Sequence, residues 1–168
     1  MCSGDHFKIL RQTLRTIMGS NNGNSGTQDT VGRIRRILDN AGVGHRFIGP
    51  QNESDTSDFV FSMDKDEDCC KDIIFVISID ENLMVLRAFM DAYNIEKSKI
   101  PDAIVYCNTW NATHSLPQVY VSEDDMIFTS WCNAITTDVS DEYIRDYMIL
   151  AYAKTSWQFF CEFAKKFI

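Results

Sequence analysis

Residues 140–166, SDEYIRDYMILAYAKTSWQFFCEFAKK, decide the fold, because they predict a long helix that is apolar on more than one face. Ser140 is a good N-cap residue, and Asp141 and Glu142 follow where negative charge complements the helix dipole. The apolar side chains exceed the single stripe of a surface helix; they are Tyr143, Ile144, Tyr147, Met148, Leu150, Ala151, Tyr152, Trp157, Phe159, Phe160, Phe163 and Phe167. Such a helix is either buried against a sheet or shared with a second subunit.

Five short strands are expected upstream of this helix. Residues 45–49, 58–63 and 73–79 are rich in β-branched and aromatic side chains, and residues 118–122 and 126–131 repeat the pattern across an acidic turn. Short polar connections favour antiparallel neighbours. The sequence therefore predicts an α+β fold with an antiparallel five-stranded sheet covered by helices.

Other segments predict helices between and before these strands. One helix begins at Asp29 or Thr30 and runs to Asn40, where Gly42 and Gly44 follow. Residues 81–114 also have helical spacing, in two apolar series: Leu83, Leu86, Phe89, Met90 and Tyr93, then Ala103, Ile104, Cys107 and Trp110.

The start of the chain predicts a separate element. Five apolar residues recur at helical spacing and form one face of an amphipathic helix; they are Phe7, Leu10, Leu14, Ile17 and Met18. Residues 19–27, rich in Gly, Asn and Ser, indicate a flexible linker. We therefore expect two parts: residues 1–28 as helix and linker, and residues 29–168 as a single α+β domain.

Composition restricts the partners and the location. The net charge of −8 argues against nucleic acid, since phosphates attract basic surfaces, although residues 1–50 carry seven Lys/Arg against three Asp/Glu. No apolar run is long enough for a membrane span, and the first residues lack the apolar block of a secretory signal. We expect a cytoplasmic protein that does not enter a membrane.

The six cysteines have no C-x-x-C spacing and are interpreted as reduced thiols. Cys69 and Cys70 leave one alternative open, a strained vicinal disulfide that senses redox state. The three histidines fit no ligand pattern, and the acidic series that begins at Asp64 lacks the Gly and Glu of a calcium loop. No metal or cofactor is expected.

No local signature of catalysis is present. The chain contains no Walker phosphate loop, no G-x-S-x-G elbow and no H-E-x-x-H pair. The most distinctive segment has two amides beside an aromatic at a predicted helix end, at Asn108, Trp110 and Asn111. These side chains either tie the helix to the next loop or contact a ligand.

The order of residues resembles the bacterial sensory transduction regulator family, the YbjN-like proteins. Four segments carry the resemblance across residues 29–168: Ile34-Arg35-Arg36-Ile37-Leu38-Asp39, Cys107-Asn108-Thr109-Trp110-Asn111, Leu116-Pro117-Gln118-Val119-Tyr120-Val121 and Val139-Ser140-Asp141-Glu142-Tyr143-Ile144-Arg145. The resemblance implies a type III secretion chaperone-like fold of order α-β-β-β-α-β-β-α. It also implies a regulator without established catalytic residues, with relatives that bind protein segments, commonly as dimers.

The first functional hypothesis is therefore a non-catalytic regulatory or chaperone-like module that binds a protein partner through Trp157, Phe159 and Phe163. The alternative is a small-molecule sensor or unrecognised enzyme with a pocket near Asn108, Trp110 and Asn111. A homodimer formed by the apolar tail is a third interpretation.

Overall fold

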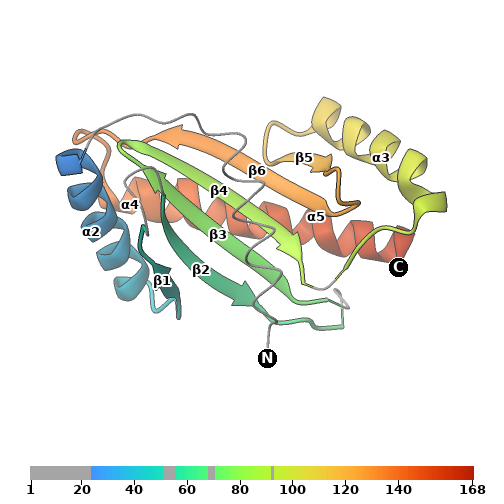
Figure 1. Cartoon of the computed structure of the whole chain (residues 1–168), viewed down its shortest axis with the longest axis horizontal. Helices are drawn as coiled ribbons and strands as arrows, with labels where there is room; N and C mark the ends of the chain where they lie inside the picture. Colours follow the sequence, from blue (N-terminus) through green and yellow to red (C-terminus); the bar gives the residue numbers. More distant parts are fainter. Residues whose placement is uncertain (1–23, 51–55, 68–70, 92) are drawn as a thin grey trace.

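A six-stranded antiparallel sheet forms the centre of the structure, a computed structural model that describes residues 24–50, 56–67, 71–91 and 93–168 (Figure 1). The spatial order of the strands is β1-β2-β3-β4-β6-β5. Their bounds are β1 (Arg46–Ile48), β2 (Ser57–Met63), β3 (Ile73–Asp80), β4 (Leu83–Met90), β5 (Gln118–Val121) and β6 (Ile127–Ala134). The α+β class and the antiparallel sheet are thereby confirmed.

The helices lie on one side of the sheet and at its ends. The last helical segment crosses behind the strands, while α2 stands at one end of the sheet and α3 lies beyond the β5 edge (Figure 1). Their bounds are α2 (Asn24–Asn40), the 3₁₀ turn η1 (Lys97–Lys99), α3 (Ile100–Thr113), α4 (Asp141–Tyr143), the π-helical η2 (Ile144–Leu150) and α5 (Ala151–Phe167). None of the helices in the described part of the chain could span a membrane.

The prediction of a helix over the first part of residues 81–114 is wrong, because β4 occupies Leu83–Met90. This strand lies between β3 and β6, so its side chains are buried on both faces and show no alternation. The predicted five strands therefore become six. The second helical series is confirmed as α3, whose buried residues are Ala103, Cys107 and Trp110.

The helix expected at Asp29 or Thr30 begins earlier, at Asn24. Residues 24–27, assigned to the flexible linker, are therefore helical. Its predicted end at Asn40 is confirmed, and Gly42 follows with a φ of 69°, in the left-handed region that glycine adopts readily. The expected helix over residues 7–18 lies outside the described residues.

One apolar core fills the space between the sheet and the helices. Every second residue of the central strands points into it, including Phe75 and Ile77 of β3 and Leu86 of β4, each at most 1% exposed. From the helical side, Phe159, Phe160 and Phe163 of α5 have no exposed surface. Burial against the sheet, the first interpretation of residues 140–166, explains most of the apolar side chains of this segment.

The start of the final helical segment agrees with its sequence signals. Ser140 caps it, since its Oγ accepts a hydrogen bond of 3.2 Å from the backbone N–H of Tyr143. Arg33 of α2 holds the preceding loop: it donates to the Asp141 carboxylate at 2.6 Å and to the backbone carbonyls of Thr136 and Val139. These contacts fix the direction in which the last helix leaves the sheet.

Candidate functional site

The three central residues expected at a ligand site all lie on α3, but they do not converge on one cavity. Trp110 is buried, Asn111 is half-buried and Asn108 is exposed. Successive positions of a helix point about 100° apart, so adjacent residues such as Trp110 and Asn111 do not share a face.

Asn111 connects α3 to the edge of the sheet. Its Nδ2 donates to the Val119 carbonyl at 2.8 Å, and its Oδ1 accepts from the Val119 N–H at 2.9 Å. Both hydrogen-bonding groups of the side chain are thus used by β5. This arrangement supports the structural interpretation of the amide.

Trp110 packs in the core and also contacts a histidine. Its ring stacks on His114 with centroids 3.8 Å apart, and it meets Phe159 edge-on at 5.1 Å. Its indole N–H is buried without a hydrogen-bond partner among the described residues. Because buried N–H groups are normally paired, this donor is the one feature here that points to a ligand or a bound water.

The expected partner-binding residues of the tail do not form a surface. Phe159 and Phe163 are fully buried, and Trp157 is half-buried and packed against the same core. A direct contact with a partner through Phe159 or Phe163 would require the core to open. Phe159 and Phe163, expected to contact a partner, face the sheet instead of solvent, because α5 turns these rings toward the core.

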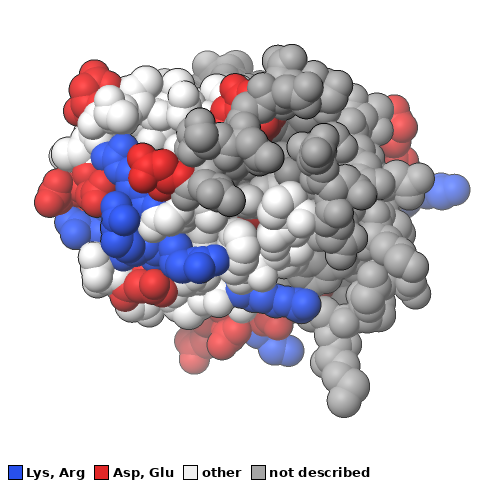
Figure 2. Space-filling model, turned by 60° about the vertical axis from the view of Figure 1, so that its left-hand side comes forward, with Lys and Arg blue, Asp and Glu red and all other residues white. Residues whose placement is uncertain are grey.

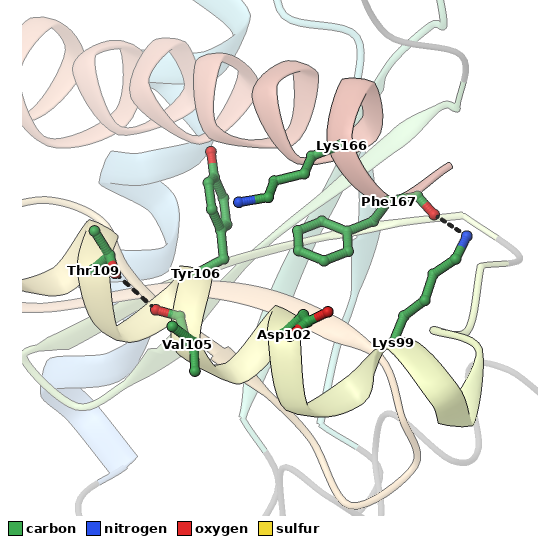
Figure 3. Close-up of a pocket in the computed structure, with 7 residues that line it drawn as sticks. All are labelled: Lys99, Asp102, Val105, Tyr106, Thr109, Lys166 and Phe167. Carbon is green, nitrogen blue, oxygen red and sulfur yellow. Dashed lines mark hydrogen bonds between the residues drawn. The ribbon is translucent and has the colours of Figure 1, made fainter.

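A groove does open between α3 and the C-terminal end of α5 (Figure 3). It encloses about 620 Å³ and is lined by Lys99, Asp102, Val105, Tyr106, Thr109, Lys166 and Phe167. The α3 residues at positions 102, 105, 106 and 109 recur at helical spacing, so one face of α3 forms a wall of the groove.

The floor of the groove is aromatic. The Tyr106 ring lies 6.0, 6.1 and 5.7 Å from the rings of Phe159, Phe163 and Phe167. Its hydroxyl donates to the Glu162 carboxylate at 3.3 Å. Burial, together with this carboxylate, raises the pKa of Tyr106 to about 12, so the phenol is neutral at physiological pH.

Two ammonium groups border the aromatic floor. Lys166 Nζ lies 5.0 Å from the centre of the Tyr106 ring, and Figure 3 shows its chain reaching across the groove toward that ring. Lys99 Nζ donates to the carbonyl of Phe167 at 2.8 Å. Because an ammonium group has three donors, each lysine can also bind an anionic group of a ligand.

One aliphatic side chain of α3 is strongly exposed at the groove. Val105, which lines it, is 64% exposed. Together with Tyr106 and Phe167 it forms an apolar surface bordered by charge. Ile104, its neighbour in the chain, is 44% exposed but does not line the groove. Ile104, expected on the buried face of α3, is exposed, and Val105, Tyr106 and Lys166 are groove residues that the sequence did not indicate.

Potential metal ligands and thiols are the other reactive groups of the described residues. The described residues contain no group of three potential metal ligands from His, Cys, Asp or Glu. Burial raises the pKa of the Cys107 thiol to about 11, which disfavours the nucleophilic thiolate at neutral pH. Cys107, Cys132 and Cys161 are not joined in disulfides, while Cys69 and Cys70 lie outside the described residues.

Charge is unevenly distributed over one face of the molecule. Figure 2 shows that Lys and Arg side chains gather on one part of this face, with Asp and Glu side chains around them. Part of the basic charge of α2 is engaged, since Arg33 pairs with Asp141 and the Arg35 guanidinium lies 4.5 Å from the centre of the Phe47 ring. Because these arginines already contact other residues of the fold, the groove is the stronger candidate for a binding site.

No protein-family model matches the chain, and no curated protein matches it significantly. The functional inference therefore depends on the geometry and chemistry of the groove.

Proposed function

We propose that this chain is a non-catalytic regulatory protein-binding module that holds a peptide segment in the groove between α3 and α5. One observation carries the proposal: an aromatic floor lies beside Val105, a strongly exposed aliphatic side chain on a helix whose opposite face is buried. Grooves lined by apolar side chains and bordered by a few polar groups are the usual binding sites for partner segments.

The chemistry of the groove favours a particular kind of segment. An apolar anchor would pack on Tyr106 and Phe167, and a neighbouring acidic side chain would pair with Lys166 or Lys99. Asp102 lines the same groove and would repel a second acidic group nearby. We therefore expect one apolar anchor and a single acidic neighbour in the bound segment.

The order of elements supports a YbjN-like regulator with a type III secretion chaperone-like fold. If the three-residue strand β1 is set aside, the described elements run α-β-β-β-α-β-β-α, the order that the resemblance implies. A regulatory role and cytoplasmic location are parts of this proposal. A protein-binding role fits relatives that bind protein segments.

A displayed library of twelve-residue peptides tests the proposal. Peptides enriched on the wild-type protein should lose binding to Val105→Asp and Lys166→Glu, because the first places a charge in the groove and the second reverses one. Ile104→Asp, which puts the same charge on a 44% exposed isoleucine of α3 outside the groove lining, is the matched control. Peptides that bind wild type, Val105→Asp and Lys166→Glu equally would contradict the groove as the site.

A second function, a small-molecule sensor near Trp110, is favoured by the unpartnered indole N–H. A metabolite that raises Tm of the wild-type protein but not of Trp110→Phe would support it, because binding to the folded state stabilises it. The side-chain NH₂ and oxygen of Asn111 are both hydrogen-bonded to β5, so this amide is not available to a ligand, which weighs against this function.

A further inference from the structure

The sheet has a second apolar cluster on the face opposite α5. Val76, Phe89, Met126 and Phe128 are each at most 7% exposed, and Val60, Ile74 and Tyr120 pack around them. The rings of Phe89 and Phe128 lie 5.5 Å apart across neighbouring strands. We call these seven residues the outer cluster.

The described helices do not cover the outer cluster. The buried apolar residues of α2, α3, η2 and α5 all belong to the core on the other face. The outer cluster, by contrast, consists of strand and turn residues. Figure 1 shows the sheet from this side, with α5 behind the strands. Burial of the outer cluster therefore calls for a cover that the described helices do not supply.

Polar groups on the same face call for a partner with acceptors. Arg87 lies opposite Val76 and Ser130 in the register and is 6% exposed, and its Nη1 has no hydrogen-bond partner among the described residues. Ser78, also on this face, has a fully buried hydroxyl without a hydrogen bond to the described residues. An occupant made only of apolar groups would leave these donors unsatisfied.

We infer that the outer cluster is the docking site for residues 7–18 of the same chain. Their apolar side chains, Phe7, Leu10, Leu14, Ile17 and Met18, have the spacing of a single helix face. A twelve-residue helix is about 18 Å long. Four strands spaced about 4.8 Å apart span nearly the same width. One such helix is therefore long enough to cover β2, β3, β4 and β6.

The connection allows this docking. Residues 19–23 precede α2, which stands at the end of the sheet where β6 ends (Figure 1). Five extended residues reach about 17 Å. In the docked arrangement, residues 7–18 would cover the sheet face opposite α5, while α2 stays at the end of the sheet.

Charge favours the same occupant. Residues 1–23 contain Lys8, Arg11 and Arg15 against a single acidic residue, Asp5, a net charge of +2, so residues 24–168 carry −8 − 2 = −10. Asp5 and the terminal backbone carbonyls of the segment are acceptors of the kind that Arg87 and Ser78 need. Docking in cis would shield an apolar sheet face from other chains, independently of the groove between α3 and α5.

Photo-crosslinking of the purified full-length protein tests the assignment. A benzoylphenylalanine placed at Leu14 should form intramolecular crosslinks to peptides of β2, β3, β4 or β6, identified by mass spectrometry. Crosslinks that join two chains would assign the cover to a second copy, and crosslinks that avoid these strands would exclude docking there; either result overturns the proposal.

A pair of charge variants gives an independent readout. Leu10→Asp/Leu14→Asp places two charges on the apolar face and should raise the fluorescence of an apolar-surface dye several-fold while circular dichroism stays native. Gln12→Asp/Thr16→Asp adds the same charge on the opposite face and should leave the fluorescence unchanged. Equal fluorescence of the two variants would contradict the docking.

Discussion

The side-chain amide of Asn111 forms a two-bond pair with the backbone of Val119, donating to its carbonyl and accepting from its N–H at 2.8 and 2.9 Å. In this position the amide imitates a neighbouring strand for β5, which is the edge strand of the sheet. Helix α3 is thereby joined to the sheet by a polar contact in addition to apolar packing.

Replacing Asn111 with Asp should therefore destabilise the fold. The carboxylate keeps the shape but loses the donor and faces the Val119 carbonyl, so we expect a loss of about 1–3 kcal/mol in the free energy of unfolding. Urea denaturation measures it. Asn108→Asp, three residues away on the exposed side of α3, is the control and should change stability by less than about 0.5 kcal/mol.

In a buried hydroxyl cluster behind β6, removing one hydroxyl should destabilise the fold more than removing all three. Thr129 Oγ1 lies 2.7 Å from the Tyr152 hydroxyl and 3.0 Å from Ser156 Oγ, and all three residues are buried. Thr129→Val alone leaves two buried hydroxyls without this partner, at a cost of about 1–3 kcal/mol. Adding Tyr152→Phe and Ser156→Ala should recover part of that stability in the same denaturation assay; a triple variant less stable than the single would contradict this account.

Phe159 should behave as a core residue. Phe159→Ala removes a fully buried ring and should cost about 3–5 kcal/mol. A loss of that size is a large part of the stability of a typical domain. Leu150→Ala, at a 42% exposed position of the same final helical segment, should cost far less. Calorimetric Tm values compare the two, and a small effect at Phe159 would return it to the candidate binding surface.

The cysteine thiols should differ sharply in reactivity. Burial raises the pKa of Cys107 from 9.0 to about 11, whereas Cys132 is exposed. At pH 8, maleimide should label Cys132 rapidly and Cys107 slowly, as measured on peptides by mass spectrometry. Fast labelling of Cys107 in the folded protein would contradict its assignment as an inert packing residue.

The raised pKa of Cys107 also predicts a pH dependence of stability. The neutral thiol is favoured by folding, so its contribution is fully present below about pH 9 and is lost as the pH rises to about 11. Tyr106, with a pKa raised to about 12, should act in the same direction at slightly higher pH. Urea midpoints of wild type and Cys107→Ala, compared from pH 8 to 11, should converge at the alkaline end.

The homodimer expected from the apolar tail should use the exposed part of the final segment. Tyr143 and Tyr147 stack with ring centroids 5.1 Å apart and are 49% and 64% exposed, and Leu150 continues this row. We propose this row as the dimer surface, and Tyr147→Ser should shift a concentration-dependent dimer to monomer in light scattering. A wild-type chain that stays monomeric at high concentration would exclude the dimer.

Local signals predicted several elements because they do not depend on distant parts of the chain. Ser140 caps its helix through its own hydroxyl, and the spacing of Ala103, Cys107 and Trp110 marks the face of α3 that packs inward. Candidate site residues were harder to predict. Val105 and Tyr106 belong to the groove because α5 ends beside them, and that proximity has no signal within α3.

Local signals are enough to predict the α+β class, the antiparallel sheet, α3 and the cap of the final helix, since caps, turns and apolar spacing act over a few residues. Long-range packing, in contrast, makes Leu83–Met90 a strand and turns the aromatic side chains of α5 inward. An apolar run buried on both faces has no periodicity to distinguish strand from helix. Its neighbours β3 and β6 supply the backbone hydrogen bonds that make it a strand.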